Sequence, residues 1–229
     1  AGVAPFFVFA GLGAVSVAMV PFMRMAPAQV ASEAGYTGRY PIWPIALCGA
    51  IVLVAFMSEA ASETWSALHV ERTLGGGAAE GALGPAMLGL TMAVGRFSGQ
   101  VVAERLREVT VVIGAAVLSS SGAVIAALAP TPPVAYLGFG ILGLGVSVIG
   151  PMGLALVGKL VAPHLRTEAI SRVAVIGFSG FFFAPMVVGF LSEAFGLRVA
   201  FMAVALLLLL AAPFAVAVAR LPFHRSDGA

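Results

Sequence analysis

Long stretches without a charged residue are the feature that most constrains this chain. Ala1–Met23, Pro41–Met57 and Val109–Gly158 contain none, and three other apolar stretches accompany them. A bilayer core is about 30 Å thick, so a helix needs about 20 apolar residues to cross it. The sequence therefore predicts an all-α, polytopic membrane protein with seven transmembrane helices. The expected spans are residues 2–22, 42–66, 83–103, 109–129, 134–158, 169–192 and 198–220.

Composition agrees with this fold class and excludes some classes of function. Hydrophobic residues make up 61% of the chain and charged residues 10%, against about 25% charged in an ordinary soluble domain. The net charge is only +2 and the basic residues are dispersed, so a nucleic-acid-binding surface is not indicated. We therefore set aside soluble enzymes and nucleic-acid-binding proteins, and expect an integral, multi-pass protein of a cell membrane.

The basic residues predict which side of the membrane each gap faces. Of the twelve, Arg72 and Arg198 fall in alternate gaps, Arg96 lies inside a span, and the other nine share the remaining gaps and the tail. Because cytoplasmic loops carry an excess of Lys and Arg, we expect the side with nine to be cytoplasmic. The chain would then begin outside and end with a cytoplasmic C-terminus. The nine are Arg24, Arg39, Arg105, Arg107, Lys159, Arg166, Arg172, Arg220 and Arg225.

The longest polar gap divides the chain into unequal parts. Residues 1–23 form a lone expected helix, 24–41 a cytoplasmic loop, 42–222 a bundle of six transmembrane helices, and 223–229 a cytoplasmic tail. The chain has no initiator Met and begins directly inside a span. We therefore expect it to be a fragment of a longer protein.

Small residues recur at helical spacing in three spans. Such stripes let helix backbones approach closely in lipid, where no hydrophobic force holds helices together. With Pro151 and Pro185 in two of these spans, the pattern fits either static packing or helices that bend and slide, and both interpretations stay open. The stripes are Gly95 and Gly99; Gly140, Gly143, Ser147 and Gly150; and Gly177, Gly180 and Ala184.

Two motifs point to a known family. Residues 180–189 read Gly-Phe-Phe-Phe-Ala-Pro-Met-Val-Val-Gly, and residues 95–105 read Gly-Arg-Phe-Ser-Gly-Gln-Val-Val-Ala-Glu-Arg. The first resembles the eleventh helix of a major facilitator superfamily (MFS) transporter, with Ala184 and Val188 in place of two of the family's glycines. The second is similar to the family's cytoplasmic G-x-L-A-D-R-x-G-R-R motif, although the terminal G-R-R is absent. The resemblance covers roughly Ile42–Pro222.

The resemblance implies the C-terminal half, helix six through helix twelve, of a secondary transporter. Two six-helix halves would rock around a central cavity, so the N-terminal half of the same transporter would be the partner of this chain. Arg96, Glu104 and Arg105 would form a cytoplasmic gate whose charge pairs break when that side opens. The motif in the sixth span would allow bending and close packing through Gly180, Ala184, Pro185 and Gly189.

Two carboxylates on the second expected span are the main candidates for a binding site. Glu59 and Glu63 are one helical turn apart, and Ser62 and Ser66 lie on the same side. Ionisable residues inside a span are costly and usually face a cavity, a partner charge or a proton path, which favours binding of substrate or protons. The alternative is that the pair lies near the outer interface, hydrated or bonded to Arg72.

Three further residues of this segment have candidate roles. Trp65 is either an interfacial aromatic anchor or a residue that stacks on substrate. His69 is expected to be solvated, as a possible pH sensor. Cys48 is the only cysteine and lies in an apolar stretch, so we expect a small buried hydrophobe and neither a disulfide framework nor a metal cluster.

The function indicated is movement of a small solute across the lipid bilayer by alternating access, coupled to protons. The sequence indicates no catalytic residues, no metal and no cofactor. It also contains no GxxxxGK[ST] nucleotide-binding loop, so energy would come from an ion gradient. Two other classes stay open at this point: a seven-helix receptor or sensor, and a structural subunit of a membrane complex.

Overall fold

The computed structural model describes residues 42–221, apart from the side chains of residues 100–104. The expected first span, the loop that follows it and the tail 223–229 lie outside the described residues. The described chain is helical throughout and contains no strand, which confirms the all-α prediction. Its long helices are α2 (Ile42–Leu68), α3 (Ala78–Arg105), α4 (Glu108–Leu128), α5 (Pro132–Leu160), α6 (Arg166–Phe195), α7 (Leu197–Leu209) and α8 (Ala211–Ala219).

Short elements link some of these helices. A π-helical turn, His69–Thr73, extends α2, and a 3-10 turn, Pro163–Leu165, precedes α6. Between α6 and α7 the chain turns at Gly196, whose φ of +84° is a left-handed conformation that favours glycine. The last expected span, 198–220, is divided at Leu210 into α7 and α8.

Five described segments are long and apolar enough to cross a membrane. The third expected span, 83–103, does form a helix, α3, but α3 is not one of the five. Arg96, Pro85 and several glycines lower its mean hydropathy. The structure therefore supports a helical membrane fold, and the count of seven spans stays a prediction. The five segments are Ile42–Thr73, Glu108–Leu128, Pro132–Leu160, Pro163–Phe195 and Leu197–Ala219.

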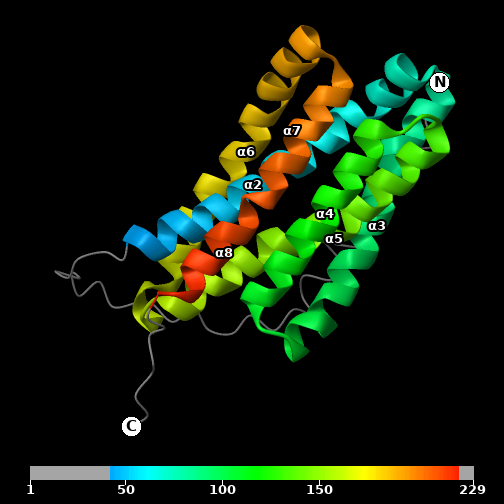
Figure 1. Ribbon diagram of the computed structural model, residues 1–229. Helices are drawn as coiled ribbons and strands as arrows, with labels where there is room; N and C mark the ends of the chain where they lie inside the picture. The colour runs from blue at the N-terminus through cyan, green and yellow to red at the C-terminus, as the bar shows by residue number, and fades with distance from the viewer. Residues whose placement is uncertain (1–41, 222–229) are drawn as a thin grey trace, which may run out of the picture. The chain divides into compact units, whose positions relative to one another are not determined.

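The helices pack as a bundle in which α5 contacts α2, α3, α4 and α6. The most extensive contacts join α4 to α5, α2 to α6 and α3 to α5, while α7 lies on α4 and α8 lies on α2 and α4 (Figure 1). A continuous core runs through the bundle, with Phe139, Leu142 and Phe201 among its fully buried side chains.

Glycines of α5 lie at close contacts with its neighbours: Gly143 belongs to a stripe that the sequence showed, and Gly138 lies outside it. A Cβ atom on Gly143 of α5 would lie 2.6 Å from the carbonyl oxygen of Leu88 in α3. A Cβ atom on Gly138 of α5 would lie 2.5 Å from the backbone nitrogen of Ala126 in α4. Both contacts are with backbone, so the glycines are required by the close approach of the helices.

Helix α6 has two faces that differ in side-chain size. The face buried in the bundle carries Gly177, Gly180, Ala184 and Val188. The opposite face exposes large apolar side chains, including Phe178, Phe182, Met186 and Phe190. The small face packs on α2, where Gly180 lies against the backbone of Leu53 and Met57.

Candidate functional site

An ion pair between α2 and α3 forms the centre of the candidate site. The Nη2 atom of Arg96 donates to the Oε1 atom of Glu59 over 3.0 Å. The side chain of Glu59 is 10% exposed, whereas that of Arg96 is 56% exposed. The carboxylate is thus enclosed in the bundle, whereas more than half of the Arg96 side chain is exposed at the surface of the bundle.

The sequence placed Arg96 in a cytoplasmic gate, and that role stays a prediction. Arg72 was considered as a partner only in the alternative in which Glu59 and Glu63 lie near the outer interface. In the structure Arg96 is the partner of Glu59, and burial of a carboxylate in an apolar bundle requires such a partner. Next to Arg96, Gly95 packs closely on α5, where a Cβ atom would lie 2.8 Å from the carbonyl oxygen of Leu144.

Within the described residues, Glu63 and the serines form no hydrogen bond with this pair. Glu63 is exposed, one turn beyond Glu59. Ser58, Ser62 and Ser66 are fully buried, and their hydroxyl oxygens have no hydrogen-bond partner within the described part of the chain. The polar side chains of α2 therefore differ in environment: the serines and Glu59 are buried in the bundle, and Glu63 is exposed.

His69 corrects a prediction. It was expected to be solvated, but it is fully buried at the start of the π-helical turn. Its Nε2 atom lies 2.9 Å from the carbonyl oxygen of Ala126 in α4. Its ring packs edge-on against Phe201 of α7, with centroids 5.0 Å apart, and against Phe139 of α5 at 6.3 Å. His69 thus ties the end of α2 to three other helices.

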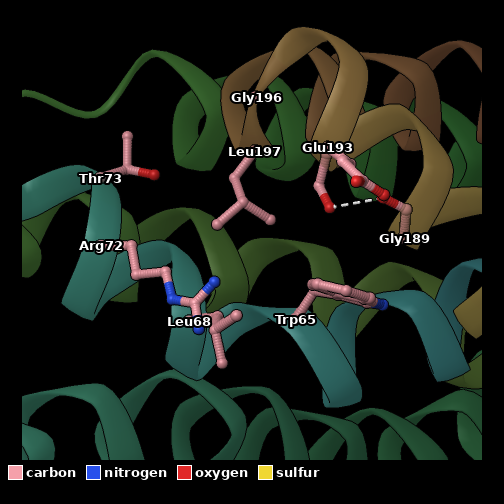
Figure 2. A pocket seen from close by; sticks show the side chains of 9 residues that line it. Trp65, Leu68, Arg72, Thr73, Gly189, Glu193, Gly196 and Leu197 are labelled. Carbon is pink, nitrogen blue, oxygen red and sulfur yellow. Dashed lines mark hydrogen bonds between the residues drawn. The ribbon is translucent and has the colours of Figure 1, made fainter.

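Trp65 lies on a different side of α2 from the ion pair, in a pocket between α2 and the end of α6. Its indole ring packs against Gly189, where a Cβ atom would lie 3.3 Å from Cζ2. Figure 2 shows the ring beneath the turn that joins α6 to α7. We call this the Trp65 pocket; it has a volume of about 540 Å³ and is lined by Trp65, Leu68, Arg72, Thr73, Gly189, Ser192, Glu193, Gly196 and Leu197.

A second ion pair lies at the opposite end of the bundle. Lys159, at the end of α5, pairs with Glu108, the first residue of α4. Arg105, a predicted gate residue, is exposed at the end of α3 nearby in sequence, while the side chain of Glu104 lies outside the described residues. The sequence offered Lys159 only as a topology signal and gave no reason to pair it with Glu108, because the two residues are far apart in the chain.

The other predicted motif residues lie in α6. Gly180 and Ala184 are buried against α2, and Pro185 lies within α6 without ending it. A proline inside a helix removes one backbone hydrogen bond, so α6 has a weakened point at its middle. Among the described residues no group of three His, Cys, Asp or Glu side chains could hold a metal ion.

Five segments long and apolar enough to cross a membrane indicate an integral, multi-pass membrane protein, and comparison with known sequences gives its family. The sequence model of the Major Facilitator Superfamily matches residues 46–228. The chain belongs to this superfamily. An uncharacterised MFS-type transporter of Yersinia pestis is 30% identical over 182 residues, which cover 79% of this chain and 47% of that protein. The chain spans less than half the length of the curated relatives that it matches.

Solved structures share the fold. The fucose:proton symporter FucP of E. coli matches with a TM-score of 0.69 and 19% identity, over 76% of this chain and 42% of FucP. The POT family transporter PepTSo matches with a TM-score of 0.68 and 17% identity, over 84% of this chain and 40% of PepTSo. At this identity the similarity establishes the arrangement of helices.

Proposed function

We propose that this chain is the C-terminal half of a secondary active transporter that moves a small solute by alternating access and couples that movement to protons through Glu59. The observation that carries the proposal is the enclosed carboxylate of Glu59, paired with a half-exposed Arg96 inside an apolar bundle. Membership of a superfamily of transporters supports the general activity. The N-terminal half of the same protein would complete the central cavity.

The ion pair suggests how coupling would work. A proton on Glu59 removes the negative charge that holds Arg96, and the guanidinium then turns away from Glu59 toward the exposed surface of the bundle. Loss of the proton restores the pair and draws α2 and α3 together. Because breaking a partly buried ion pair is costly, protonation would shift the balance between two packings of these helices.

The same proposal includes a cytoplasmic gate and the orientation of the chain in the membrane. Arg105 and Glu104 would pair with the other half when the cytoplasmic side closes, and the Lys159–Glu108 pair would hold α4 and α5 together at that end. This end collects Arg105, Arg107, Lys159 and Arg166, which supports its placement in the cytoplasm. The C-terminus would then be cytoplasmic as well.

The experiment is transport by the complete protein in proteoliposomes. Vesicles are incubated with an extract of bacterial metabolites, with and without an imposed proton gradient, and solutes that accumulate are identified by mass spectrometry. We expect gradient-dependent accumulation of at least one solute, and its loss in Glu59→Gln. The matched control is Glu168→Gln, which removes an exposed carboxylate on α6 paired only with Arg172 one turn away.

Two results would count against the proposal. Full gradient-driven transport by Glu59→Gln would remove Glu59 from the coupling mechanism. Binding of a solute without any transport would favour a receptor or sensor, and the absence of both would favour a structural subunit.

A further inference from the structure

We propose that the Trp65 pocket is a second ligand site, separate from the Glu59–Arg96 pair, that binds a small zwitterion with an apolar body. The pocket lies at the end of the bundle opposite the Lys159–Glu108 pair, because α6 runs from that pair's end to this one. Its volume of about 540 Å³ lies within the range of about 300–1,000 Å³ that is usual for small-molecule sites.

The walls of the pocket carry two opposite charges. Arg72 comes from the π-helical turn after α2, and Glu193 comes from the last turns of α6 (Figure 2). Within the described part of the chain, neither side chain forms an ion pair. Both charged groups are exposed, so each is available to a ligand group of opposite charge.

Three apolar side chains form much of the rest of the lining. Leu197 is buried at the start of α7, Leu68 faces it from α2, and the Trp65 ring forms the floor against Gly189. The indole Nε1 atom of Trp65 is buried without an acceptor in the described part of the chain. Because protein atoms enclose Nε1, a ligand in the pocket would contact the face of the indole ring and not this atom.

Two irregular backbone segments border the pocket. Arg72 is carried by a π-helical turn, an irregularity that is frequent at functional sites. Gly196 turns the chain with a positive φ and so brings Leu197 over the opening. Ser192 already donates its hydroxyl hydrogen to the carbonyl oxygen of Gly189 over 2.9 Å, so toward a ligand it offers only an acceptor.

These features together select the class of ligand. A carboxylate would bind the guanidinium of Arg72, which presents planar paired donors, and an ammonium would bind the carboxylate of Glu193. The apolar body between the two charges would lie on Trp65 and Leu197. A molecule with a single charge would leave one wall unpaired, and an uncharged one would leave both.

The test uses the full-length protein in lipid nanodiscs and three probes with the same phenyl body. Phenylalanine carries both charges, phenethylamine only the cation and 3-phenylpropionate only the anion. Binding is measured by isothermal titration calorimetry. We expect phenylalanine to bind at least tenfold more tightly than either single-charge analogue, since a charge-assisted hydrogen bond is lost with each.

Two substitutions assign the charges to the walls. Arg72→Gln is expected to make phenylalanine bind no better than phenethylamine, and Glu193→Gln to make it bind no better than 3-phenylpropionate. Glu71→Gln is the matched control, because Glu71 belongs to the same π-helical turn but does not line the pocket.

Three outcomes overturn the proposal. The first is that phenylalanine does not bind at millimolar concentration. The second is that the single-charge analogues bind as well as phenylalanine. The third is that Arg72→Gln and Glu193→Gln bind like the unaltered protein while retaining its melting temperature.

Discussion

The substitution Gly180→Ala tests the close contact between α2 and α6. A Cβ atom on Gly180 would lie 2.8 Å from the backbone nitrogen of Met57, 3.0 Å from the carbonyl oxygen of Leu53 and 3.2 Å from the Cβ atom of Met57. Non-bonded heavy atoms pack at about 3.5–4.0 Å. The shortest of these contacts would therefore have to lengthen by at least about 0.7 Å, from 2.8 Å to 3.5 Å.

The cost of that shift follows from which atoms must move. Two of the three atoms belong to the backbone of α2, so no side-chain rotation relieves the contact and the helices must separate. Overpacking of this kind costs about 1–3 kcal/mol, while replacing a glycine inside a helix by alanine gains about 0.5–1 kcal/mol. We expect a net destabilisation of roughly 1–2 kcal/mol.

The assay is thermal unfolding of the purified full-length protein in detergent. The matched control is Gly114→Ala in α4, where an added Cβ atom meets nothing within 4 Å, so only the helix gain should apply. We expect the melting temperature to fall for Gly180→Ala and to stay level or rise for Gly114→Ala. Equal stability of the two variants would refute the inference that α2 and α6 are in backbone contact at Gly180.

Further predictions concern the interior of the bundle. In a double-mutant cycle, the destabilisations caused by Glu59→Gln and Arg96→Gln should together exceed that of the double variant, because each single substitution leaves a charge without its partner. Additive effects on the melting temperature would contradict the pair. His69→Leu should lower stability by about 1–3 kcal/mol, since it leaves the carbonyl oxygen of Ala126 unpaired inside the bundle; an unchanged melting temperature would contradict this. Cys48 is fully buried, so it should react with maleimide only after unfolding, and rapid labelling of the native protein would contradict its placement.

Helix positions followed closely from the sequence, because uncharged length alone determines them. The expected spans 109–129, 134–158 and 169–192 correspond to α4, α5 and α6 to within three residues at each end. The glycine stripes also predicted where helices approach, since spacing on a helix fixes which residues share a face. The expected span 198–220 missed the division at Leu210 because both sides of it are equally apolar.

Partners of the polar residues did not follow from the sequence. Glu59 pairs with Arg96, 37 positions away, and His69 bonds to Ala126, 57 positions away. Both contacts depend on how helices cross, which local patterns do not encode. The sequence also placed Trp65 with the carboxylates because they are neighbours in the chain, whereas a helix directs them to different sides.

The two faces of α6 suggest how the inward face of an apolar helix could be recognised. Both faces are apolar, so a hydrophobicity scale assigns them the same environment. They differ in volume: Gly180 and Ala184 turn inward, and Phe182 and Phe190 turn outward. A neighbouring backbone at close approach leaves no room for a bulky side chain. A profile of side-chain size along the sequence would therefore identify the face of α6 that packs on α2, and it would do so from the sequence alone.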